Sequence, residues 1–157
     1  MKKIILLLVF TVLIAGVLNA QKAIGLRLGY DAQEFSYQNS IGSDARLELT
    51  LGVNTFDHNS SGNLCRGVGL NGVYQWVHNL SSVADGLNWY YGFGVAGVLH
   101  GGLFGAGIDG QIGVEYNFNS PFQLSLDYRP GFYWLPDSGK VYRFSWNLPC
   151  AAIRYRF

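Results

Sequence analysis

The chain has 157 residues, of which 49% are hydrophobic, 15% aromatic and only 13% charged, whereas ordinary soluble domains carry about a quarter charged residues. The length suits a single domain, and the formal net charge of +1 provides neither a basic surface for nucleic acid nor an acidic tail. These values argue against a nucleic-acid-binding protein, and the composition differs from that of an ordinary soluble domain.

The first twenty residues have the pattern of an export signal. Lys2 and Lys3 precede an apolar run from residue 4 to residue 17, and Ala20 ends a short stretch suited to cleavage. We therefore predict a signal peptide over residues 1–20 and a mature domain over residues 21–157. An uncleaved membrane anchor is the alternative. Loss of Lys2 and Lys3 changes the formal net charge from +1 to −1.

Alternation of apolar and polar residues predicts that the mature domain is all-β, because successive side chains of a strand face opposite sides. We expect eight strands, over residues 23–31, 34–41, 44–56, 65–79, 87–100, 107–119, 121–134 and 141–157. The uncharged stretch Gly86–Ile108 is not a membrane helix, since it holds eight glycines and each costs about 1 kcal/mol against alanine in a helix interior.

The last expected strand changes phase along its length. Its large apolar residues are even-numbered before Pro149, as at Phe144 and Trp146, and odd-numbered after it, as at Ile153 and Tyr155. Because proline lacks the N–H group that a sheet ladder needs, we predict a β-bulge at this proline.

The apolar face of these strands fits lipid better than a soluble core. Aromatic residues gather near both ends of the strands around a mainly aliphatic middle, as in membrane barrels. The opposite face carries nearly balanced charges, and an eight-stranded barrel has a lumen that side chains just fill. We predict that these charges pair inside the lumen, and the candidate residues are Arg27, Arg46, Glu48, Asp109, Glu115, Asp127, Arg129, Arg154 and Arg156. A soluble barrel with these charges on its outer surface is the alternative.

Three stretches carry a family resemblance: "GLNWYYGFGVAG" around 87–97, "GIDGQIGVEYNFNSPFQLSLDYRPGFY" at 107–133, and the ending "IRYRF". They resemble the small bacterial outer-membrane β-barrel family, of the OmpX and OmpA membrane-domain type, over residues 23–157. The resemblance implies an eight-stranded antiparallel up-and-down transmembrane β-barrel. It also implies that Tyr155 and Phe157 belong to a C-terminal signal for the barrel-assembly machinery.

No constellation of catalytic or metal-binding residues stands out. The histidines, His58, His78 and His100, lack ligand spacing, and nothing marks a nucleophile–base pair. We therefore expect no enzyme activity, no metal and no cofactor. Cys65 and Cys150 leave a disulfide open as an alternative to two free, packed thiols.

Together these observations predict a monomeric protein of the bacterial cell outer membrane, with a structural or surface-interaction role. Its expected partners are outer-membrane lipids and lipopolysaccharide, with the barrel-assembly machinery during insertion and no nucleic acid. A lipid A-modifying enzyme, either acyltransferase or deacylase, and a small-conductance channel are the alternatives.

Overall fold

The computed structural model of the chain describes residues 21–30, 32–58, 64–134, 143–146 and 148–157. The predicted signal peptide, residues 1–20, lies outside them. All regular structure in the described ranges is β-strand, and they contain no helix with the length and hydropathy to cross a bilayer.

Within these ranges the strands follow one another along the chain with only turns between them. They are β1 (Lys22–Leu28), β2 (Ala32–Ile41), β3 (Ala45–His58), β4 (Leu64–Asn79), β5 (Leu87–His100), β6 (Leu103–Asn117), β7 (Phe122–Tyr128), β8 (Gly131–Trp134), β9 (Arg143–Ser145) and β10 (Cys150–Arg156).

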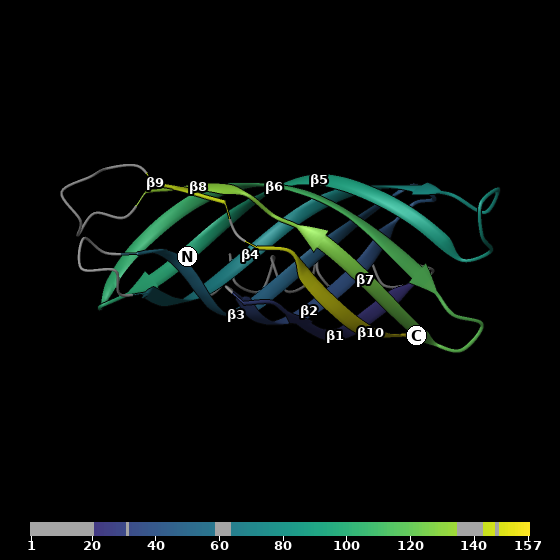
Figure 1. Cartoon of the computed structure of the whole chain (residues 1–157), viewed down its shortest axis with the longest axis horizontal. Coiled ribbons are helices and arrows are strands. Elements are labelled where there is room, and N and C mark those ends of the chain that lie inside the picture. Colours follow the sequence, from purple (N-terminus) through teal and green to yellow (C-terminus); the bar gives the residue numbers. More distant parts are fainter. Residues whose placement is uncertain (1–20, 31, 59–63, 135–142, 147) are drawn as a thin grey trace, which may run out of the picture.

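These strands form a closed antiparallel barrel with eight wall strands (Figure 1). Each of β1 to β5 pairs with the strand that follows it, and β1 also pairs with β10 to close the ring. Both β7 and β8 pair with β6, so they are two halves of the seventh wall strand. Because β9 pairs with β8 and β10 with β7, these two form the eighth. The predicted eight-stranded up-and-down barrel is confirmed.

The seventh and eighth wall strands are both interrupted where a proline lies. The expected continuous strand 121–134 is divided at Arg129 and Pro130, although the Pro130 carbonyl still accepts a bond from the Gly110 N–H at 2.9 Å. In the eighth, residues 146, 148 and 149 lie outside any strand. Phe144 and Trp146 are exposed before this break, and Ile153 after it. The phase change is therefore confirmed, but it occurs across a gap in the ladder and not at a one-residue bulge.

The connection between β5 and β6 differs from the sequence-based expectation. The expected strands 87–100 and 107–119 leave residues 101–106 as a loop, yet β6 already begins at Leu103 and the turn consists of Gly101 and Gly102. Both glycines have positive φ, 58° and 84°. Two consecutive left-handed residues are the requirement of the tight type I′ hairpin turn, so this glycine pair extends the two strands instead of ending them.

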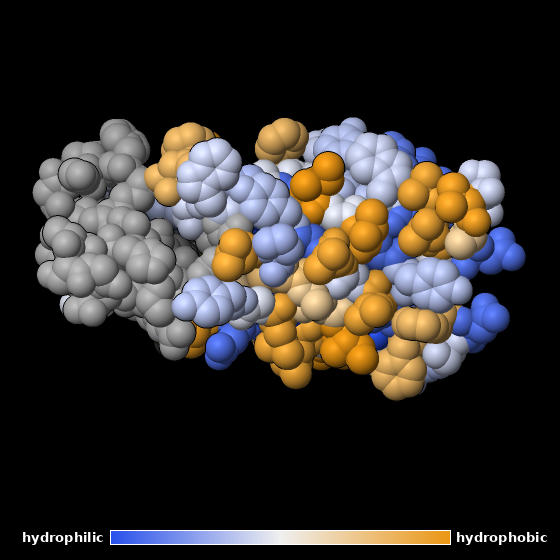
Figure 2. Space-filling model, in the orientation of Figure 1, coloured by the Kyte–Doolittle hydropathy of each residue, from blue (hydrophilic) through white to orange (hydrophobic). Residues whose placement is uncertain are grey.

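The barrel is apolar outside and polar inside. Outward-facing Leu126, Ile112 and Phe93 are 54%, 53% and 68% exposed, and apolar side chains spread over the face seen in Figure 2. Among the buried side chains of the described residues, charged and amide groups outnumber large aliphatic ones. This inverts the arrangement of a water-soluble protein, in which polar groups leave the interior unless they are paired.

Candidate functional site: the charged lumen and its polar cavity

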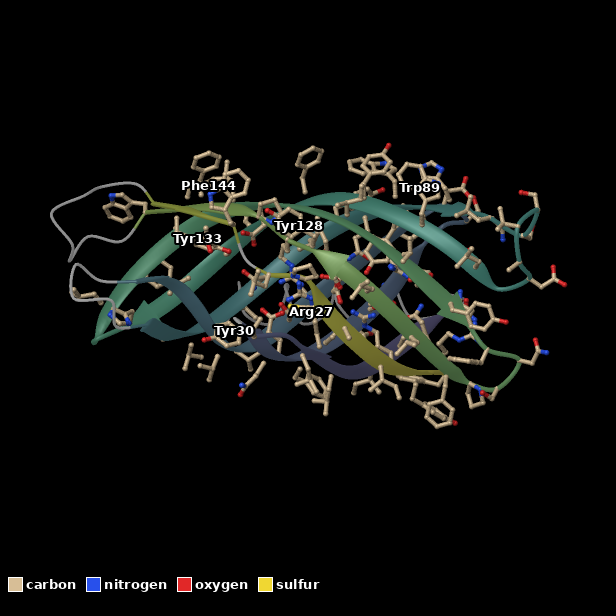
Figure 3. The ribbon with its side chains drawn as sticks, viewed as in Figure 1. Arg27, Tyr30, Trp89, Tyr128, Tyr133 and Phe144 are labelled. Atoms are coloured by element: carbon tan, nitrogen blue, oxygen red, sulfur yellow. The ribbon has the colours of Figure 1, made fainter. Side chains whose placement is uncertain are left out.

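The inward face of the wall brings most of the predicted lumen residues together. Eight of them are buried, at 5% exposure or less, and come from β1, β3, β6, β7, β10 and the break between β7 and β8: Arg27, Arg46, Glu48, Asp109, Glu115, Asp127, Arg129 and Arg154. Figure 3 shows Arg27 within the barrel, while Trp89 and Phe144 point away from it. Buried charges of this kind persist only when they are paired and hydrogen-bonded.

The centre of the lumen is built on Glu48 of β3 and Arg154 of β10. Arg154 Nη2 lies 2.6 Å from Glu48 Oε1, and Ser36 Oγ donates to the same oxygen at 2.7 Å. The other two guanidinium nitrogens of Arg154 donate to Ser36 Oγ at 2.8 Å and to Ser125 Oγ at 2.7 Å. Gln75 Nε2 donates to Glu48 Oε2 at 2.6 Å. Strands β2, β3, β4, β7 and β10 are thereby joined across the lumen.

A second group of charges surrounds Arg27 of β1. Its Nη1 lies 2.7 Å from Glu34 Oε2, while Nε donates to Asp127 Oδ1 at 2.9 Å. Tyr90 O–H donates to the other oxygen of Asp127 at 3.2 Å. Arg129 approaches Glu34 Oε2 at 3.4 Å and therefore shares that carboxylate with Arg27. Because one arginine spans two carboxylates, β1 is tied to both β2 and β7.

Arg46 and Glu115 form a third pair, nearer the end of the barrel where β10 finishes. Arg46 Nη1 lies 2.5 Å from Glu115 Oε2, and its Nε donates to Gln75 Oε1 at 2.5 Å. The guanidinium also lies over the ring of Tyr90, 4.6 Å from the ring centroid. Asn88 Nδ2 donates to the remaining oxygen of Glu115 at 3.1 Å.

The structure does not bring Asp109 and Arg156 into this network. Among the described residues Asp109 has no ion-pair partner, and its Oδ1 accepts a 2.6 Å bond from Tyr133 O–H. Arg156 is only half-buried, at the end of β10, and its Nη2 donates to the carbonyls of Phe118 and Ser120 at 2.8 and 3.1 Å. Both residues occupy inward-facing positions of their strands. Asp109 nevertheless contacts the phenol of Tyr133, and Arg156 contacts the β6–β7 turn.

A polar cavity of about 220 Å³ opens at the same end of the barrel as Arg156. It lies beyond the Arg46–Glu115 pair, and amide side chains from five strands line it: Gln38, Asn79, Asn88, Asn117 and Gln123. Within the described part of the chain, Arg46 Nη2, Gln123 Oε1 and Arg156 Nε are buried atoms without a hydrogen-bond partner. The cavity therefore combines space with polar groups that the barrel itself leaves unused.

Sequence analysis missed the uncharged members of the lumen. Gln75, Gln111, Asn71 and Tyr90 are all buried and hydrogen-bonded to lumen carboxylates or amides. A signal was available, because each occupies the inward parity of its strand. Selecting lumen residues by charge alone overlooked them, and alternation would have found them.

His78 and Cys150 take no part in the ion pairs found among the described residues. His78 stacks on Trp89 and Tyr91 outside the barrel, with centroids 4.8 and 5.6 Å apart. Cys150 is a buried free thiol, so the alternative of a Cys65–Cys150 disulfide is not formed. Three or more His, Cys, Asp or Glu side chains arranged to hold a metal ion are not found within the described ranges.

Comparison of the chain with protein-family models, with curated proteins and with solved structures finds no match.

Proposed function

We propose that this protein is an integral outer-membrane β-barrel protein with a structural or surface-interaction role. The observation that carries the proposal is the inversion of polarity: large apolar side chains cover the outside while paired charges fill the inside. A bilayer requires such an exterior, and it requires a closed barrel because no strand edge is then left unpaired in lipid. One chain closes the ring alone, which fits a monomer.

The aromatic residues support this placement. Trp76, Tyr91 and Trp89 form a stacked row on the outside of β4 and β5, near the strand ends, with centroid separations of 5.3 and 5.5 Å. Phe132, Phe144 and Trp146 form a second row near the opposite end. Amphipathic rings favour the headgroup regions of a bilayer, so the two rows mark its two interfaces.

The filled centre of the lumen favours this role over a channel. Glu48, Arg154 and Gln75 bridge the wall from several sides, and an open water path would require their displacement. A lipid A-modifying activity needs a nucleophile, a base and an orienting group that converge. No contact among the described residues sets such a group apart, so a non-catalytic role is the proposal.

The end of the chain fits the proposed assembly signal. Tyr155 and Phe157 both face outward, at 47% and 61% exposure, and the backbone of Phe157 pairs with Lys22. The terminal side chain is thus accessible to the assembly machinery until lipid covers it. Deletion of Phe157 is expected to reduce the amount of protein in the outer membrane, measured by immunoblotting, with Lys22→Gln as a control at the paired position.

Fractionation of expressing cells tests the location. We expect the protein in the outer-membrane fraction, with faster gel mobility before boiling than after because the closed barrel resists SDS. Recovery in the periplasmic fraction with one mobility would contradict the proposal.

A pair of arginine substitutions tests which solvent the outside meets. Ile112→Arg lies near the middle of β6 and Tyr116→Arg near its end, and both positions face outward. In a bilayer we expect losses of unfolding free energy of about 2–4 kcal/mol for the first and about 0–1 kcal/mol for the second. Equal small losses, measured by denaturant unfolding in lipid vesicles, would indicate that water surrounds the barrel.

A further inference from the structure

The polar cavity has features of a binding site that the proposed function does not use. It lies at the end of the lumen where β1 begins and β10 ends, and its floor is the buried Arg46–Glu115 pair. Its volume of about 220 Å³ equals roughly seven waters at about 30 Å³ each. That space suits a small molecule of about a dozen non-hydrogen atoms and is too small for a folded partner.

Two side chains of the lining are more than nine-tenths buried and hold hydrogen-bonding atoms without a partner among the described residues. Arg46 is 5% exposed, and its Nη2 has no partner among the described residues, although Nε and Nη1 are engaged. Gln123 is 3% exposed, and its Oε1 is likewise unpartnered while Nε2 donates to Asn117 Oδ1 at 3.2 Å. Leaving such a buried group unsatisfied costs about 1–3 kcal/mol, which a ligand group would recover once the flexible side chain turns that atom toward the cavity.

The charged side chains that line the cavity favour a ligand with one negative charge. Its inward-facing charged side chains are Arg46, Arg156 and Glu115, so one positive charge remains uncompensated. Lys22 also borders the cavity but occupies an outward-facing position of β1. A monoanionic carboxylate matches this balance, and its two oxygens suit a guanidinium donor. A phosphate dianion would place a second negative charge close to Glu115.

The amide side chains that line the cavity favour a ligand with a peptide unit next to its carboxylate. Asn79, Asn88, Asn117, Gln38 and Gln123 present both N–H donors and carbonyl acceptors around one space. A peptide unit offers the complementary acceptor and donor, and the free Gln123 Oε1 in particular requires a donor from the ligand.

We infer that this cavity binds the C-terminal end of a short peptide, with its carboxylate on Arg46 and Arg156 and its amide N–H on Gln123. The inference concerns the inside of the barrel, and so it holds or fails independently of the proposed membrane location.

Calorimetric titration of the purified full-length protein in zwitterionic detergent tests this site. The probe is N-acetyl-alanylalanine, the matched ligand is the same compound with a C-terminal amide, and inorganic phosphate is the third arm. We expect the carboxylate probe to bind with a Kd on the order of 1 mM, as suits a ligand of this size, and the other two to bind at least about tenfold more weakly. Equal binding of the amide, equal or tighter binding of phosphate, or no binding of the probe overturns the inference.

Two kinds of variant locate the site. Arg46→Lys keeps the charge but removes the forked donor, and we expect at least about tenfold weaker binding. Since Arg46 also supports the fold, Asn79→Asp supplies a gentler test: Asn79 Oδ1 accepts the Ser81 N–H at 2.7 Å, and an aspartate preserves that turn. Its added charge should weaken binding about two- to threefold at low salt.

Asn119→Asp is the matched control, because it adds the same charge to an exposed turn that does not line the cavity. We expect the affinity of this variant to equal that of the unmodified protein. Equal effects of Asn79→Asp and Asn119→Asp would overturn the assignment of the site to this cavity.

Discussion

Two arginines of the lumen, Arg154 at its centre and Arg46 at its cavity end, show two uses of the same side chain. Each of the three guanidinium nitrogens of Arg154 donates to an oxygen of Glu48, Ser36 or Ser125. Arg46 leaves one nitrogen unpartnered beside a cavity. Complete pairing indicates a residue that holds the wall together, whereas an unused donor on a residue that lines a cavity fits the ligand contact that we infer for Arg46.

We expect the largest change in unfolding free energy from Glu48→Gln, which tests the role of Arg154 at the centre. This change keeps the shape of the side chain but leaves Arg154 as a buried charge without its counter-ion. We expect a loss of about 3–5 kcal/mol of unfolding free energy, measured by denaturant titration followed through tryptophan fluorescence. A loss below about 1 kcal/mol would show that the central pair behaves like a surface ion pair.

Gly113→Ala probes how tightly the centre is packed. A β-carbon at Gly113 would lie 2.7 Å from the Tyr90 hydroxyl and 2.7 Å from Asp127 Cβ. Because both neighbours belong to the network, we expect a loss of about 1–3 kcal/mol in the same unfolding measurement. Gly110→Ala, where a β-carbon meets nothing within 4 Å, is the control and should change stability by less than about 1 kcal/mol.

Glu115→Gln is the counterpart of Glu48→Gln at the cavity end. Arg46 would keep its bond to Gln75 and its contact with the Tyr90 ring, and water in the cavity can solvate the charge. We therefore expect a loss of only about 1–2 kcal/mol. If this loss matched that of Glu48→Gln, the ion pairs at the centre and at the cavity end would contribute equally to stability, and the two regions would not differ in this respect.

The smallest effect is expected from Gln123→Ala. This side chain donates one hydrogen bond, to Asn117, and its Oε1 has no partner among the described residues. Its removal loses the bond to Asn117 but also removes the unsatisfied oxygen, so the two effects offset each other and the unfolding free energy should change by less than about 1 kcal/mol. A loss of several kcal/mol would place Gln123 with the structural residues of the centre.

Alternation along the chain predicted the strands of the barrel, and the family resemblance implied how they are arranged. Period-two patterning gave eight strands, and the even-to-odd change of exposed residues around Pro149 appeared in the sequence before it appeared in the structure. These features are local: each depends on which side of a strand a residue faces, and that follows from position alone.

The lumen contacts depended on information that a sequence pattern does not hold. Asp109 and Arg156 have the parity of the lumen residues, yet their partners are Tyr133 and two turn carbonyls. The partner of an inward residue is set by strand stagger and by depth along the barrel, which join residues as far apart as Arg27 and Asp127. The cavity was also missed, since it results from side chains that are too short to meet across one end of the ring.

The backbone pairing of Lys22 with Phe157 has a consequence for the synthesis of the protein. The N–H and C=O of these two residues exchange hydrogen bonds at 3.1 and 2.9 Å, so β1 finds its second neighbour in β10, which follows all the other strands along the chain. Contacts between such distant positions make for slow folding. The ring can close only when β10 has been made, and until then the backbone edge of β1 is unpaired and open to other strands.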